Sequence, residues 1–496
     1  MKSICSIVLV LSTAGTLAFT PARTPAQTPA PLATAAEHQQ WGRLSNLIDD
    51  DVAVDQAQPD GMTALHWAAR WNHPIAISRL VAAGQPVDAA TDYGVTPLAI
   101  ACRYGNLNAA TALLDLGADA TQQTSGDETM LMHAARVGNA SLVRALIDHG
   151  ALVNAKQRDD QTALMWAAEA GHADVVGVLI DNGADFRHAL RSGFTAFYFA
   201  VRQGHADAAA KLLDAGVDVN DRMNPQSRSE RSPRKGTTAL LLAVESGHFE
   251  LALQLVDRGA DPNDQRSGFA PLHALSWVRR PSRGDNAAGD PPPQGSGTVG
   301  SLQFARELVA RGADVNLQLT QGNYRKAKLT EKGATPMLFA AFTSDLPYAQ
   351  TLKELGADIQ LANVDGTTPI LAAAGVGIFV ADEYPGTEDQ TLAMIDQIVE
   401  WGGRINDTDQ HGETVVHGAA YRSFPRVVDR LVELGAKPEH WYRDNSLGST
   451  PRQLAQGKRP GSFKPNKATV AAIDRALKAA GIEPEEWERP KKTSQY

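Results

Sequence analysis

The stretch TALHWAARWNHPIAISRLVAAG, residues 63–84, decides the fold. Its apolar residues fall in two short segments with helical spacing. A basic and an aromatic residue, Arg70 and Trp71, lie between them. A pair of helices this short cannot bury its own apolar face, so the meaning of the stretch depends on whether the pattern returns along the chain.

The same phrase returns at a fixed period. Threonines mark it at positions 63, 96, 129, 162 and 195, each 33 residues after the last. The pattern then continues with interruptions, and its threonine or equivalent positions are 238, 270, 335, 368, 414 and 450. The chain of 496 residues therefore contains eleven copies of one unit, which replace the separate domains that its length would otherwise predict.

Each copy predicts a helix, a turn and a second helix. A threonine at the N-cap accepts hydrogen bonds from free backbone N–H groups, and Pro97 and Pro336 follow such threonines at the first helical position. Central glycines such as Gly138 and Gly171 suit the left-handed backbone that ends a helix. The polar stretch after each closing glycine supplies the turn residues of a finger that leads to the next unit.

These phrases, among them GMTALHWAAR, GVTPLAIACR and GTTPILAAAG, resemble the ankyrin repeat family. The family consensus combines Gly-x-Thr-Pro-Leu-His-x-Ala-Ala, a central Gly-His and a closing Gly-Ala-Asp. The resemblance implies an all-α fold, an ankyrin-repeat solenoid of about eleven helix-turn-helix units with hairpin-like fingers. At about 8 to 10 Å per unit, the solenoid would be a curved rod on the order of 100 Å long.

The ends of the chain differ from the array. A lysine, a short apolar run and small residues predict a signal peptide over residues 1–22, and residues 23–35 predict a Pro/Ala/Thr-rich linker. The array is expected over residues 36–482 and a loose C-terminal tail over 483–496. We expect the first unit to be truncated, with residues 36–51 as its second helix alone.

Four insertions interrupt the period, at residues 221–236, 278–300, 317–333 and 375–390. The first and third are basic and lengthen fingers, whereas the second and fourth fall between the two helices of a unit. The Pro/Gly-rich second insertion reads as a tolerated loop, and its GxGxxG at Gly295, Gly297 and Gly300 lacks the preceding strand of a dinucleotide site. The apolar residues of the fourth, Ile378, Phe379, Val380 and Tyr384, are expected to pack on the array or to meet a partner.

Composition narrows the function classes. The formal net charge of −9 argues against nucleic-acid binding, which needs a basic face. Of the two cysteines, Cys5 lies in the predicted signal peptide, so Cys102 alone forms neither a disulfide nor a cysteine-based metal site. His66, His273 and His417 occupy a consensus position and predict structural hydrogen bonding, and the acidic residues that close units, such as Asp218 and Asp261, predict contacts with turn backbone groups. We expect no cofactor, no metal and no catalytic residue.

The two residues before the central glycine carry the predicted partner-binding site. By resemblance to ankyrin arrays they face a concave groove, and arginine and aromatic side chains are the types that dominate interface energetics. The predicted site residues are Arg70, Trp71, Arg103, Tyr104, Arg136 and Arg202. The alternative, which can coexist with binding, is that Asp60, Asp92, Asp127 and Asp159 in the fingers neutralise these arginines.

Two functions follow. The first is an exported, non-catalytic scaffold or adaptor that holds a protein partner with an acidic or carboxylate-bearing surface. It would be periplasmic or secreted, monomeric, and without stable membrane insertion after cleavage; a bacterial source fits best, and an inhibitor or immunity partner of a secreted enzyme is a special case. The second is an enzyme or small-ligand-binding protein whose site is built where the insertions at 278–300 and 375–390 converge.

Overall fold

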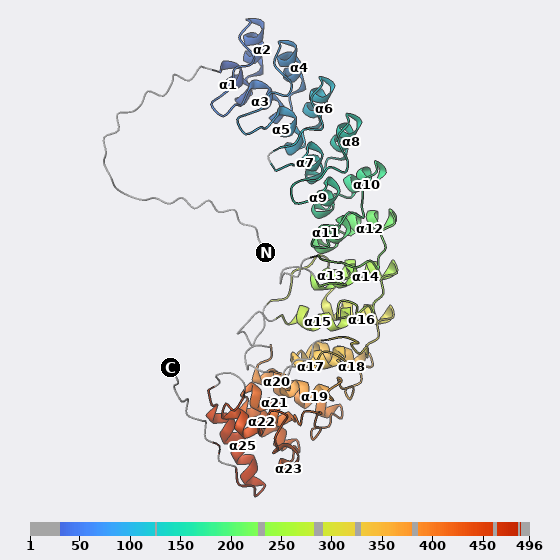
Figure 1. The fold of residues 1–496 in the computed structure, drawn as a ribbon, viewed down its shortest axis with the longest axis vertical. Coiled ribbons are helices and arrows are strands. Elements are labelled where there is room, and N and C mark those ends of the chain that lie inside the picture. Colours follow the sequence, from blue (N-terminus) through green and yellow to red (C-terminus); the bar gives the residue numbers. More distant parts are fainter. Residues whose placement is uncertain are drawn as a thin grey trace, which may run out of the picture. The chain divides into compact units, whose positions relative to one another are not determined.

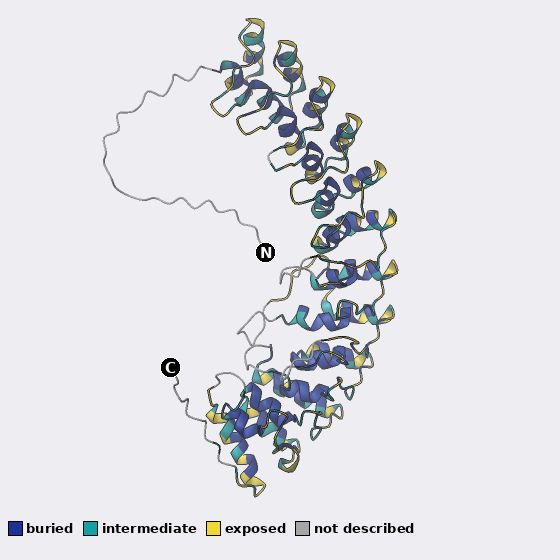
Figure 2. Cartoon of the chain, in the orientation of Figure 1, coloured by how far each residue is buried: buried dark blue, intermediate teal, exposed yellow. Residues whose placement is uncertain are grey.

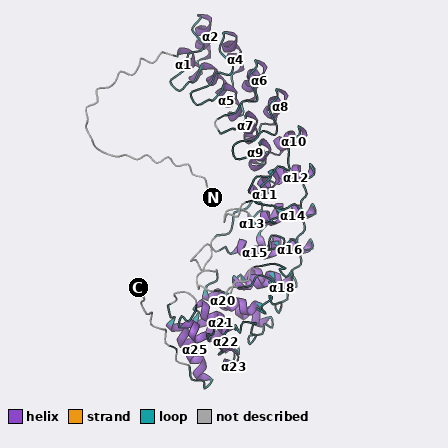
Figure 3. Cartoon of the chain, viewed as in Figure 1, coloured by secondary structure: helices purple, strands orange, loops and turns teal. Residues whose placement is uncertain are grey.

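A computed structural model describes residues 30–124, 126–226, 234–281, 291–322, 329–378, 385–459, 464–484 and 487. All regular structure in these residues is helical, as Figure 3 shows. They contain no strand, and an isolated antiparallel bridge joins Arg222 and Thr238. The fingers are thus built mainly from turns, with isolated bridge residues such as Arg222 and Gln123 but no strand in the described residues. None of their helices is long and apolar enough to span a membrane.

The chain divides into two compact units. The first comprises residues 1–126 with Asp148–Ala151, and the second comprises Asp127–Ile147 with Leu152–Tyr496. In the first unit, α1, α3 and α5 pack one on the next in one layer, and α2, α4 and α6 do so in another (Figure 1). Its helices are α1 (Pro31–Glu37), α2 (Trp41–Asp49), α3 (Ala64–Arg70), α4 (Pro74–Ala82), α5 (Pro97–Tyr104) and α6 (Leu107–Asp115).

The second unit continues the same two-layer arrangement. Its first helices pack in series from α7 to α21 and then α24. Among its second helices, α10 packs on α12, and a second series runs from α14 through α16, α18, α20 and α22 to α25. The helices are α7 (Met130–Val137), α8 (Ala140–Asp148), α9 (Ala163–Ala170), α10 (Ala173–Asp181), α11 (Ala196–Gln203), α12 (Ala206–Asp214), α13 (Ala239–Glu245), α14 (Phe249–Asp257), α15 (Pro271–Arg279), α16 (Ser301–Ala310), α17 (Pro336–Phe342), α18 (Leu346–Glu354), α19 (Pro369–Ala374), α20 (Glu388–Glu400), α21 (Val415–Arg422), α22 (Pro425–Glu433), α23 (Pro438–Trp441), α24 (Pro451–Ala455) and α25 (Lys467–Ala479).

The repeat threonines begin the first helices, as the sequence predicts. All eleven marked positions are N-caps with extended backbone, ten of them threonine and one Ala270. Thr96 is typical, since its hydroxyl oxygen accepts the backbone N–H of Ala99 at 3.3 Å. The side chains that each first helix turns toward its neighbours are buried, and Figure 2 shows this burial between the two layers.

The N-terminal boundary differs from the prediction. α1 occupies the last five residues of the expected linker, and its Leu32, Ala33 and Ala35 are buried. Together α1 and α2 form a complete helix pair, so the expectation of a first unit reduced to its second helix is wrong. This first unit lacks the repeat phrase. Ala30 occupies the N-cap without a capping side chain, and only Pro31 at the first helical position marks the start of the helix.

The insertions lie against the array wherever they are described. Ile378 is buried in an apolar cluster with Leu338, Phe339 and Phe342, as expected for this insertion, whereas Phe379, Val380 and Tyr384 fall outside the described residues. The glycines of the GxGxxG motif also have a packing role: a Cβ on Gly295 would lie 1.8 Å from the carbonyl oxygen of Gly247.

The central Gly-His motif joins successive repeats of the second unit. Gly171 ends α9 with a φ of +81°, and a Cβ on it would lie 2.5 Å from Nδ1 of His205, one repeat further on. His205 in turn donates from Nε2 to the carbonyl oxygen of Glu169 at 3.0 Å. The glycine therefore supplies both the left-handed turn and the space for the next histidine, and Gly138 and His172 repeat the arrangement.

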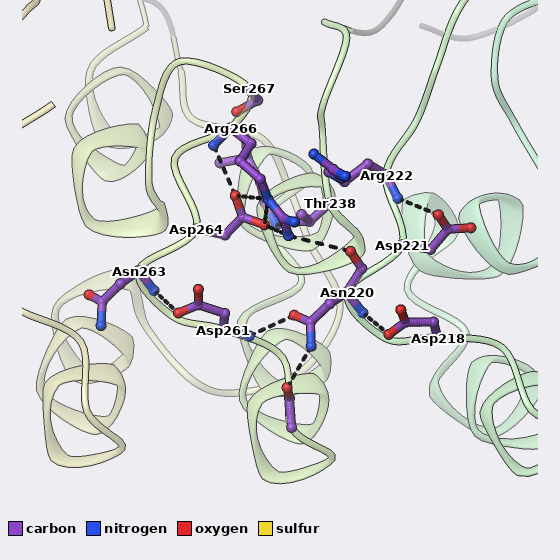
Figure 4. Close-up of polar contacts among 12 residues, drawn as sticks. Asp218, Asn220, Asp221, Arg222, Thr238, Asp261, Asn263, Asp264, Arg266 and Ser267 are labelled. Carbon is purple, nitrogen blue, oxygen red and sulfur yellow. Dashed lines mark hydrogen bonds and ion pairs between the residues drawn. The ribbon is translucent and has the colours of Figure 1, made fainter. Parts of the chain in front are cut away.

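In five repeats of the second unit an asparagine ties the finger to the next repeat. In Figure 4, Asn220 donates to the carbonyl oxygen of Gly259 and accepts from the backbone N–H of Asp261, both at 2.9 Å. Asp218 accepts the backbone N–H of Asn220, which fixes the turn. The same pair of contacts recurs at Asn154, Asn263, Asn316 and Asn406. The predicted turn role of the closing aspartates is confirmed at Asp119, Asp185, Asp218, Asp261 and Asp314.

Two glycine-to-alanine variants separate the two demands on the central glycine. Gly183 has a φ of +83°, and a Cβ added there would meet no neighbouring atom. Gly183→Ala should therefore lower the free energy of unfolding by about 1 to 2 kcal/mol, which is the cost of the left-handed backbone alone. Gly171→Ala must also displace His205 and should lower it by several kcal/mol in urea unfolding. Equal losses for the two variants would contradict this account of the motif.

Candidate functional site

A hollow of about 540 Å³ opens in the first unit between two fingers and the helices α3 and α5. Four of the six predicted site residues line it: Arg70 and Trp71 at the end of α3, and Arg103 and Tyr104 at the end of α5. The fingers and the end of α1 complete the wall. The remaining lining residues are Glu37, His38, Asp60, Met62, Trp67, Thr91, Tyr93, Val95 and Ile100.

The repeat itself places these side chains. Arg70 and Arg103 stand at equivalent positions 33 residues apart, each in the last turn of a first helix. A left-handed Gly105 at a φ of +70° ends α5 directly after Tyr104. The residues before the turn therefore line the hollow beside the finger, and Trp71, Arg103 and Tyr104 among them are exposed.

Arg70 is stacked between two aromatic rings. Its guanidinium carbon lies 4.4 Å from the ring centroid of Tyr104 and 5.5 Å from that of Trp71. Both rings remain open to solvent, with 51% of Tyr104 and 40% of Trp71 exposed, and Tyr93 on the finger is 76% exposed. Exposed aromatic side chains gathered around one hollow are typical of a binding surface.

The acidic groups of the hollow already have partners. Oε2 of Glu37 accepts a hydrogen bond from the Gln58 amide at 2.7 Å, and Oε1 of Gln58 accepts from the indole of Trp67 at 2.9 Å. Asp60 accepts the backbone N–H of Met62 at 3.1 Å.

The two arginines of the hollow lack such partners. Within the described part of the chain, neither the Arg70 nor the Arg103 side chain makes a hydrogen bond or an ion pair. The alternative that finger aspartates neutralise the arginine row therefore fails at these two positions. Asp127, which belongs to the second unit, lies instead 3.8 Å from Arg158.

The two predicted arginines of the second unit have different surroundings. The guanidinium of Arg136 lies 5.0 Å from the ring centroid of Trp166, and that of Arg202 lies 4.6 Å from Phe194. Arg202 also forms an ion pair of 3.2 Å with Glu169, the residue that replaces arginine in this row. Arg202 is thus already satisfied within the protein.

Sequence reasoning missed the rings on which these arginines stack. Trp166 and Phe199 each stand four residues after a repeat threonine, and Phe199 lies 5.1 Å from the guanidinium of Arg202. The signal was present, because the same position carries an aromatic residue in three of the first five marked copies. Tyr93 was missed as well, since it belongs to a finger and has no periodic equivalent.

The consensus histidines have the structural role that the sequence predicts. Nε2 of His66 lies 3.0 Å from the Val95 carbonyl oxygen, and that of His417 lies 3.1 Å from the Arg443 carbonyl oxygen. Burial lowers the pKa of His273 to about 4 and that of His417 to about 3, so both are neutral. No group of three or more His, Cys, Asp or Glu in the described residues is arranged to hold a metal. Cys102 is buried, and burial raises the pKa of its thiol.

A cluster of buried acidic residues with raised pKa values lies in the core near α21. Burial raises the pKa of Glu413 to about 8. Its Oε1 accepts from the Tyr421 hydroxyl at 3.0 Å and from the Asn445 amide at 2.8 Å. Burial also raises the pKa of Asp409, which accepts the backbone N–H of Glu413 at 2.9 Å. These contacts tie one finger to the next, so we assign the cluster to stability.

The insertions at 278–300 and 375–390 do come together. Arg280 donates to Oε1 of Gln390 at 2.6 Å and to the Ser344 carbonyl oxygen at 2.9 Å. Beside it, Arg279 forms a buried bidentate pair with Asp345, at 2.7 and 3.0 Å. Arg279 and Arg280 at this edge are thereby engaged, whereas Arg70 and Arg103 of the hollow make no such side-chain contact in the described residues.

The raised pKa of Glu413 predicts a pH dependence of stability. The folded chain holds this proton up to about pH 8, whereas the unfolded chain releases it near the ordinary value of 4.5, so the free energy of unfolding falls as pH rises between these values. Glu413→Gln keeps the Oε1 acceptor and should flatten this decline and stabilise the chain at pH 8, measured by urea unfolding at several pH values. Glu439→Gln, at an exposed carboxylate, is the control. A decline that persists unchanged in Glu413→Gln would contradict the assignment.

The repeats of this chain are similar to those of known proteins. A family model described as ankyrin repeats in three copies matches residues 32–124, 116–189, 131–223 and 187–266. Among solved structures, the crystal structure of the human ASB11 ankyrin repeat domain is 26% identical, with a TM-score of 0.40, and the match covers 46% of this chain and 98% of that chain. No curated protein matches the chain.

Proposed function

We propose that this chain, an all-α ankyrin-repeat solenoid whose repeats match the family model over residues 32–266, is a non-catalytic scaffold that binds a protein partner. Ankyrin repeats generally mediate protein–protein interaction, and neither the family model nor the similar structure names a catalytic family. The observation that carries the proposal is the hollow of the first unit, where exposed aromatic rings lie beside two arginines whose side chains make no hydrogen bond or ion pair in the described residues.

The contacts made at the other candidate site, where two insertions meet, support this choice. At the edge where the insertions meet, the described side chains of Arg279 and Arg280 are engaged with Asp345 and Gln390. The hollow instead presents Trp71, Tyr93 and Tyr104 to solvent. Such rings bury a large area at low conformational entropy when a partner covers them.

We further propose that the protein is exported, acts in the periplasm or outside the cell, and is a monomer. The support is the lysine, the short apolar run and the small residues of the first 22 positions. The N-terminal residue of the protein isolated from its native source tests the export, with a start near residue 23 expected. A native protein that still begins at Met1 would contradict it.

The scaffold proposal predicts a partner that depends on the hollow. The full mature chain is used as bait in cell extract, beside a Trp71→Ala/Tyr104→Ala variant and an Ile75→Ala control, whose residue is 69% exposed on α4. We expect at least one protein to be retained by the wild type and the control but lost, with at least tenfold lower recovery, on the double variant.

The double variant should unfold at the same temperature as the wild type, since the two substituted rings lie at the surface. If every protein retained by the wild type is retained equally by the double variant, the hollow is not the binding surface and the proposal fails.

A further inference from the structure

We infer that the hollow of the first unit recognises a linear peptide segment of the partner in which an aspartate or glutamate stands next to an aromatic residue. The inference rests on the proposed function and specifies the chemistry of its ligand. The observations behind it are the stacked guanidinium of Arg70, the unpartnered side chain of Arg103, and the exposed rings beside them.

Stacking prepares Arg70 to bind a carboxylate. A guanidinium that lies against an aromatic face uses its flat side, so its N–H donors, which point outward in its plane, stay free. The guanidinium carbon of Arg70 lies 4.4 Å from the ring centroid of Tyr104 and 5.5 Å from that of Trp71, so both rings limit where the group can move. A planar donor pair fixed in this way matches the two oxygens of a carboxylate and binds them through charge-assisted hydrogen bonds.

The polar contacts of the hollow leave unsatisfied N–H donors rather than a net positive charge, since Glu37 and Asp60 balance the formal charge of Arg70 and Arg103. Glu37 is hydrogen-bonded to Gln58, and Asp60 to the backbone of Met62. Arg70 and Arg103 have no such contacts in the described residues. The acids are therefore satisfied within the protein while the guanidinium donors are not, so the complementary ligand group is an anion.

The size and the remaining charges of the hollow limit that anion. A volume of about 540 Å³ admits a few side chains and not a folded domain. Glu37 and Asp60 in its wall would repel a polyanion such as a nucleic acid, and the net charge of the chain is −9. A single carboxylate with an apolar neighbour fits best. The ring of that neighbour would pack against Tyr93 and Trp71, which are exposed.

Peptide selection on the full chain tests the inference. Phage-displayed random peptides of twelve residues are selected against the immobilised protein, and the enriched peptides are synthesised and their dissociation constants measured by fluorescence anisotropy. We expect an Asp or Glu next to an aromatic residue in the enriched sequences. Replacing that acid by its amide should weaken binding at least tenfold.

Variants of the protein locate the binding. Arg70→Gln and Arg103→Gln should each weaken the enriched peptides at least tenfold, and Arg70→Lys should not restore binding, because an ammonium lacks the planar donor pair. Arg144→Gln, at an exposed arginine of α8, is the matched control and should change the affinity less than twofold. Far-UV circular dichroism and thermal unfolding confirm that each variant is folded.

Three results would overturn the inference: no enriched peptide, enriched peptides that tolerate loss of the acid, or affinity that does not depend on Arg70 and Arg103. Phosphorylated forms of the enriched peptides that bind more than tenfold tighter would also overturn it, since the site would then select phosphate. These outcomes are separate from the proposed function. A partner protein lost on Trp71→Ala/Tyr104→Ala leaves the scaffold role standing even if the peptides fail.

Discussion

The structure depends on one constraint: a pair of short helices, most of them seven to nine residues long, cannot cover its own apolar face, so each repeat must be completed by its neighbours. Apolar packing supplies most of the energy, but directional contacts fix how one repeat meets the next. His205 reaches back to the Glu169 carbonyl oxygen at one edge, and Asn220 reaches forward to Gly259 at the other. These contacts recur at a fixed spacing, which explains why the sequence keeps its period where no insertion intervenes.

The hollow follows from this arrangement. Arg70 and Tyr104 belong to consecutive repeats, and only the stacking of α3 on α5 brings the guanidinium over the ring. A binding surface of this kind is built from residues that are local in sequence yet come from different repeats. A different residue at one of those positions changes the surface without disturbing the fold. Glu169, for example, stands where other repeats have arginine, and it pairs with Arg202.

Much of this could be predicted from the sequence because the dominant interactions are local and periodic. The threonine positions gave the starts of eleven helices, and the resemblance to ankyrin repeats gave an all-α solenoid and four residues of the hollow. The start at α1 was missed because its unit lacks the repeat phrase. The aromatic partners Trp166 and Phe199 were not recognised, and Tyr93 was not predictable because nothing periodic marks a finger residue. The contact of Arg280 with Gln390 joins residues 110 positions apart, which no period relates.

The central claim is that stability is transmitted between neighbouring repeats rather than through one shared core. Hydrogen–deuterium exchange of the full chain carrying Phe197→Ala tests it most directly, because this buried side chain lies in α11, between α9 and α13. Removing it should cost about 3 to 5 kcal/mol locally. We expect faster exchange in α9 to α14, weakening with distance, and unchanged exchange in α22 and α25. Equal acceleration in every helix, or acceleration confined to α11, would contradict the claim.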